Sequence, residues 1–166
     1  MEAAVWGLIG TVIGTAASIA TTMLTTHHAM RIQREKDSLD RQERVRAFQR
    51  DNLLQVQETL QDALRLMGRA HTEDVMANRR DGVAWGKSYL SDEVDQNSHL
   101  ALRRMFALTE RVADDALRLE LTDIRAMIAR TLLAKSEIEA DAFFADVSAA
   151  AERVMGQLGK ALRAQY

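Results

Sequence analysis

The densest group of polar side chains lies in the segment GRAHTEDVMANRR, residues 68–80. His71 and Asp74 are three residues apart, so one face of a helix can present an imidazole and a carboxylate together. This pair is the best candidate for a metal or acid–base site, but both kinds of site need further groups. The alternative is a structural histidine, hydrogen-bonded near a helix end. We expect that structural role, with no metal and no cofactor.

Other sequence signatures of enzyme chemistry are missing. Neither Gly-x-Ser-x-Gly nor His-Glu-x-x-His occurs, and no His has Glu three residues before it, as di-iron bundles require. The chain has no Cys, which excludes disulfides and thiolate metal sites. The glycine run GLIGTVIG, residues 7–14, follows no predicted strand and is therefore not a nucleotide-binding loop.

The elements that position these residues are predicted to be helices throughout. The 166 residues include no Pro, and the eight Gly are sparse after residue 14, so little would interrupt a helix. Beyond residue 45, apolar residues recur every three to four positions in four segments. We predict an all-α fold, in which an N-terminal transmembrane helix continues into a stalk and a cytoplasmic helical bundle. The net charge of −2 gives no reason to expect a nucleic-acid partner.

Local signals predict where the bundle helices begin and end. The first is expected to stop at Asp81-Gly82, before an ordered loop over 83–97 in which Ser91-Asp92 is a possible cap. Asp114-Asp115 and the capping box Ser136–Glu139 are expected to begin the last two helices. The residues expected to face the core are Phe48, Leu53, Val56, Leu60, Leu64, Met67, Leu100, Met105, Phe106, Leu108, Val112, Leu117, Leu121, Ile124, Met127, Ile128, Leu132, Ile138, Phe143, Val147, Val154 and Leu158.

Residues 3–26 contain no charged side chain. As a helix they would extend roughly 36 Å, against about 30 Å of bilayer hydrocarbon, and Trp6 lies where an interfacial aromatic residue would. A removable signal peptide would need a basic N-terminal region, which is missing, although Ser18-Ile19-Ala20 resembles a cleavage site. A buried helix of a soluble protein would not be apolar or small on every side for this length. We expect a single transmembrane span.

Basic residues follow this stretch and do not precede it. Residues 1–30 contain no Lys or Arg, whereas residues 31–50 contain seven, interleaved with four acidic residues. Because the positive flank of a span stays in the cytoplasm, we expect a bacterial inner-membrane protein with its N-terminus outside. The expected domains are an anchor (1–28), a charged stalk (29–50) that could form a weak coiled coil or contact lipid headgroups, and a cytoplasmic bundle (51–166).

Small and hydroxyl-bearing residues define two faces of the predicted anchor. Gly10, Gly14 and Ser18 are spaced by four, which lets helix backbones approach closely and predicts a homo-oligomer. Hydroxyl-bearing residues spaced by four and three form a second row, the hydroxyl seam. Its hydroxyls could bond to carbonyls of their own helix, contact other copies of the chain, or line a narrow water-filled path. This hydroxyl seam consists of Thr11, Thr15, Ser18, Thr22 and Thr25.

The segments GRAHTEDVMA, VAWGKSYL and RVADDALR, within residues 48–130, resemble small actinobacterial membrane-anchored helical proteins without an assigned activity. One span followed by a bundle is also similar in architecture to membrane accessory proteins of bacterial antiviral systems. Some of these have a bundle resembling the HEPN nuclease fold and assemble into pores. The HEPN ribonuclease pattern places Arg five residues before His, where this chain has Leu66 and Val94, so the resemblance implies no nuclease.

We therefore expect a membrane-anchored, self-associating scaffold that is not an enzyme. Its expected partners are the lipid bilayer, further copies of itself and an unidentified protein. The first alternative is an oligomeric pore or effector in defence or stress. The second alternative is an enzyme or metal protein centred on His71 and Asp74.

Overall fold

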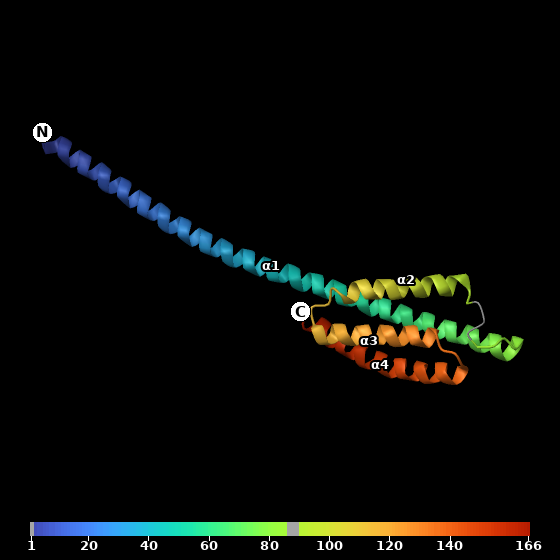
Figure 1. The fold of residues 1–166 in the computed structure, drawn as a ribbon. Helices are drawn as coiled ribbons and strands as arrows, with labels where there is room; N and C mark the ends of the chain where they lie inside the picture. Colours follow the sequence, from blue (N-terminus) through green and yellow to red (C-terminus); the bar gives the residue numbers. More distant parts are fainter. Residues whose placement is uncertain (1, 86–89) are drawn as a thin grey trace. The chain divides into compact units, whose positions relative to one another are not determined.

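The computed structural model describes residues 2–85 and 90–166, although at 2–13, 16, 17, 19, 20 and 24 it describes only the backbone. The described residues form four helices and no strand (Figure 1). The helices are α1 (Glu2–Asp81), α2 (Asp92–Thr109), α3 (Asp115–Leu132) and α4 (Glu137–Arg163). The predicted all-α class is confirmed.

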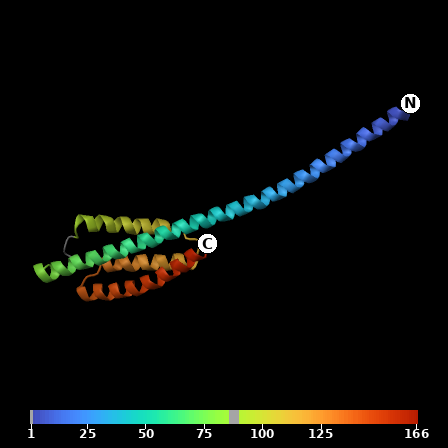
Figure 2. The same ribbon diagram turned by 180° about the vertical axis from the view of Figure 1, so that it is seen from behind.

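The chain divides into two compact units, Met1–Val45 and Arg46–Tyr166. In the second unit, residues 46–81 of α1 and the three later helices form an up-and-down bundle, each helix antiparallel to the one before it (Figure 1 and, from behind, Figure 2). Short connections favour this arrangement, because consecutive helices then pack as antiparallel neighbours. The predicted helical bundle is therefore confirmed.

All four helices supply side chains to one apolar core. Leu60 of α1, Met105 of α2 and Leu121 of α3 are completely buried, and Leu158 of α4 is nearly so. Each helix therefore buries one stripe and leaves the opposite face to solvent. The buried core cluster consists of Leu53, Val56, Leu60, Ala63, Met67, Met105, Leu108, Val112, Leu117, Leu121, Ile124, Ile128, Val147, Ala150, Ala151, Val154 and Leu158.

Four of the residues expected in the core are exposed instead, namely Phe48, Leu100, Phe106 and Ile138. On α2 the reason is geometric. With 3.6 residues per turn, Leu100 and Phe106 lie roughly 140° and 100° around the helix from the buried Met105. The prediction treated an apolar cluster on α2 as one stripe, although only part of it faces inward.

The predicted C-terminus of α1 and the predicted N-terminus of α3 agree with the structure. α1 ends at Asp81, and Gly82 follows with a positive φ of 66°, which glycine adopts without steric cost. Asp114 caps α3, because its side-chain carboxylate accepts a hydrogen bond from the Leu117 N–H at 3.0 Å. Both ends follow from local residue chemistry.

The capping box at the start of α4 is also present, in a shifted form. The Ser136 hydroxyl accepts from the Glu139 N–H at 3.2 Å. The Glu139 carboxylate reaches back to accept from the Lys135 N–H at 2.8 Å, one residue earlier than in the usual motif. Two backbone donors are satisfied by this exchange.

The start of α2 corrects the predicted loop. The helix begins at Asp92, so the second half of the segment 83–97 is helical. Ser91 is its N-cap, but its side chain makes no capping bond. The Ser91 N–H and hydroxyl both donate to the Glu73 carboxylate of α1 at 3.0 Å. A tertiary contact replaces the local cap that the sequence suggested.

Candidate functional site

His71 of α1 contacts a carboxylate of α4. Its Nε2 atom lies 3.1 Å from the Asp141 Oδ1 atom. The His71 side chain is 20% exposed, whereas Asp141 is largely exposed. The sequence candidate paired His71 with Asp74 of the same helix, whereas the contact with Asp141 connects two helices of the bundle.

Aromatic rings surround the His71 imidazole. The centroids of Trp85 and Phe144 lie 5.7 and 5.4 Å from its own, both in tilted orientations. The His71 Nδ1 atom is buried and has no hydrogen-bond partner among the described residues. The described His, Asp and Glu side chains form no group of three that could hold a metal ion. His71, Asp141 and Phe144 thus form part of the contact between α1 and α4.

Replacing His71 by alanine should lower the free energy of unfolding by about 1–2 kcal/mol, because a mostly buried ring and its hydrogen bond to Asp141 are lost. Urea denaturation followed by circular dichroism measures this change. The matched control is His99→Ala, since His99 also contacts an aspartate but is 70% exposed; it should change stability by less than about 0.5 kcal/mol. Stoichiometric metal in the parent that disappears in His71→Ala would contradict the structural role.

In the first unit, the hydroxyls of Thr22 and Thr25 bond to their own helix. Thr22 Oγ1 donates to the Ser18 carbonyl at 2.8 Å, and Thr25 Oγ1 donates to the Thr21 and Thr22 carbonyls at 2.9 and 3.0 Å. Such bonds satisfy hydroxyls without an external partner.

Several predicted packing residues also lie on this part of α1. Gly14, Thr15 and Ser18 are exposed, and a Cβ built on Gly14 would meet no atom within 4 Å. The side chain of Thr11 and the surroundings of Gly10 lie outside the described residues. Within the described part of the chain, no helix has a stretch with the length and hydropathy of a membrane span.

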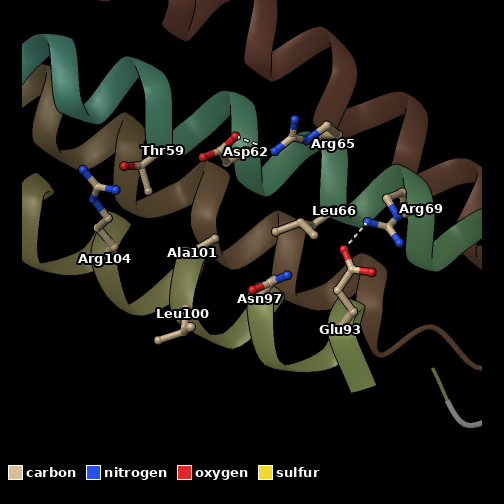
Figure 3. A pocket seen from close by; sticks show the side chains of 10 residues that line it. All are labelled: Thr59, Asp62, Arg65, Leu66, Arg69, Glu93, Asn97, Leu100, Ala101 and Arg104. Carbon is tan, nitrogen blue, oxygen red and sulfur yellow. Dashed lines mark hydrogen bonds and ion pairs between the residues drawn. The ribbon is translucent and has the colours of Figure 1, made fainter. Parts of the chain in front are cut away.

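A groove of about 410 Å³ lies between α1 and α2, a feature that the sequence analysis did not identify (Figure 3). Its floor includes Leu66, which is buried, and its rim includes Leu100, which is 62% exposed. The residues that line it are Thr59, Asp62, Arg65, Leu66, Arg69, Glu93, Asn97, Leu100, Ala101 and Arg104. The sequence analysis predicted a loop over 83–97 and therefore did not place Glu93 and Asn97 on a helix that borders α1.

Two arginines of the groove form ion pairs with carboxylates that also line it. The guanidinium of Arg65 lies 2.9 Å from the Asp62 carboxylate, and that of Arg69 lies 3.0 Å from the Glu93 carboxylate. The second pair bridges α1 and α2. The hydrogen bond from Arg69, and then its charge, lower the pKa of Glu93, while Glu93 raises the pKa of Arg69 in the same way. This bridge is therefore intact at neutral pH and is lost as acid protonates Glu93.

Arg104 differs from the other two arginines of the groove. No carboxylate of the described residues lies within ion-pair distance of its guanidinium. Figure 3 shows this side chain extending from α2 toward Thr59 of α1, without an interaction to any other residue drawn. The groove thus combines one uncompensated cation and two paired arginines with the apolar side chains of Leu66, Leu100 and Ala101.

Comparisons with protein families, curated proteins and solved structures gave no match to this chain.

Proposed function

We propose that this protein is a membrane-anchored, self-associating scaffold whose helical bundle binds a partner protein. The observation that carries the proposal is the composition of α1. This single helix contains the uncharged residues 3–26 and also supplies Leu53, Val56 and Leu60 to the bundle core. In the proposal, this helix connects the uncharged segment, which serves as the membrane anchor, to a folded domain.

The proposed location is the bacterial inner membrane, with the N-terminus outside and the bundle in the cytoplasm. The support is the one-sided distribution of Arg and Lys, which begins at Arg31. The hydroxyls of Thr22 and Thr25 donate to carbonyls of their own helix, so the free-energy cost of placing them in lipid is small. No enzyme activity is part of the proposal.

Self-association is proposed to use the small-residue face that contains Gly10, Gly14 and Ser18. In lipid, helices associate through close packing and interhelical contacts, since apolar burial gives no advantage there. Gly14 has open space around it within the chain, which leaves room for a second helix. Further along α1, Ile32 and Leu39 are seven residues apart and both are exposed, a spacing that suits a coiled-coil contact between copies.

Gly14→Leu should weaken the oligomer, because a bulky side chain would separate backbones that are proposed to touch. The mass of the complex in mild detergent and in lipid, compared with that of the parent, measures this effect. The matched control is Thr15→Val with Thr22→Val, which keeps side-chain shape beside the small-residue row but removes two hydroxyls. We expect the control to leave the mass unchanged.

The same variants test the pore as the alternative function. Because Thr22 and Thr25 donate to their own helix, we expect no conductance that depends on the hydroxyl seam. An unchanged mass for Gly14→Leu would refute the packing proposal. Conductance of the parent in planar bilayers that the valine pair abolishes would favour the pore over the scaffold.

A further inference from the structure

Three side chains of different chemical type line the groove between α1 and α2 in a row along α2. Asn97, Leu100 and Arg104 follow one another at three and four residues, so they occupy successive turns of one face. The row offers an amide, an exposed apolar side chain and an uncompensated guanidinium. Thr59 and Leu66 of α1, which are both buried, form part of the floor.

We propose that this groove binds an acidic amphipathic helix of a partner protein. A carboxylate of the partner would pair with Arg104, and an apolar side chain one turn away would pack on Leu100 and Ala101. Because Leu100 and Arg104 are one turn apart, the matching residues of the partner must be three or four residues apart. This inference concerns the bundle alone and does not depend on the membrane proposal.

The charges of the groove favour a carboxylate over a phosphate. Arg65 and Arg69 already have carboxylate partners at 2.9 and 3.0 Å, so one guanidinium is left to pair with one new anion. A phosphate carries more charge and would meet repulsion from Asp62 and Glu93. An open groove bordered by two helices also suits a helix better than a small molecule, which is usually enclosed on most sides.

The test uses fluorescence anisotropy with the full chain in mild detergent. The probes are labelled peptides of about 15 residues, the length at which isolated helices become populated, with Glu and Leu three or four residues apart in an alanine and glutamine background. Matched peptides carry Lys in place of Glu. The protein variants are Arg104→Ala and, as a control on the same helix, Arg103→Ala, whose side chain does not line the groove. Both arginines are exposed, and circular dichroism verifies that the variants fold.

We expect the acidic peptides to bind and the lysine peptides not to bind. Arg104→Ala should weaken binding about tenfold, and Arg103→Ala less than about twofold. The proposal is overturned if no acidic peptide binds, if both peptide types bind equally, or if both variants lose affinity to the same extent. It is also overturned if phosphatidylserine vesicles or inorganic phosphate bind through Arg104 and the peptides do not.

Discussion

Leu121→Ala should lower the free energy of unfolding of the bundle by about 3 kcal/mol. The Leu121 side chain is fully buried on α3 and belongs to the core cluster that all four helices build. Truncation removes its buried methyl groups and leaves a cavity that the surrounding helices fill only in part. Urea denaturation of the full chain in mild detergent, followed by circular dichroism, measures the loss. A protein of ordinary marginal stability would then be close to unfolding.

The matched control is Leu119→Ala on the same helix. Leu119 is 63% exposed, so the same truncation there should change the free energy of unfolding by less than about 0.5 kcal/mol. Equal losses for the two variants would mean that the inward face of α3 has been assigned incorrectly, and with it the core of the bundle.

The helix ends could be predicted from sequence because their signals are local. The Asp114 cap, the Ser136–Glu139 exchange and the glycine after Asp81 each depend on residues within a few positions of one another. At these three ends, no tertiary contact displaces the local one. The pattern of apolar residues likewise predicted most of the core.

Contacts between helices were not predictable in the same way. The sequence paired His71 with Asp74 on the same helix, whereas the structure shows a contact between His71 and Asp141 of α4. Ser91 was expected to cap α2, but Glu73 of α1 takes both of its donors. Periodicity shows that a residue lies on a helix, but the partner of a side chain depends on how the helices pack.

The groove was missed for the same reason. Its charged residues look like an ordinary solvated helix surface in the sequence, with pairs such as Asp62 and Arg65 at the usual spacing. Only the packing of α2 against α1 leaves Arg104 without a carboxylate beside an exposed leucine. The sequence has no acidic residue three or four positions from Arg104, but only the folded bundle shows that this unpaired charge lies in a groove.

Cysteine labelling in intact cells tests the proposed membrane topology most directly. The chain contains no Cys, so a single introduced thiol is the only one that can react. The variants are Ala3→Cys, before the uncharged stretch, and Gln165→Cys, near the end of the bundle. Because basic residues are found only after residue 30, the positive-inside rule places the first thiol outside and the second in the cytoplasm.

An impermeant thiol reagent should therefore label Ala3→Cys in intact cells and leave Gln165→Cys unlabelled. After the membrane is permeabilised, Gln165→Cys should become labelled to the same extent, which controls for the reactivity of that position. Labelling of Gln165→Cys in intact cells, with Ala3→Cys protected, would contradict both the orientation and the cytoplasmic location of the bundle.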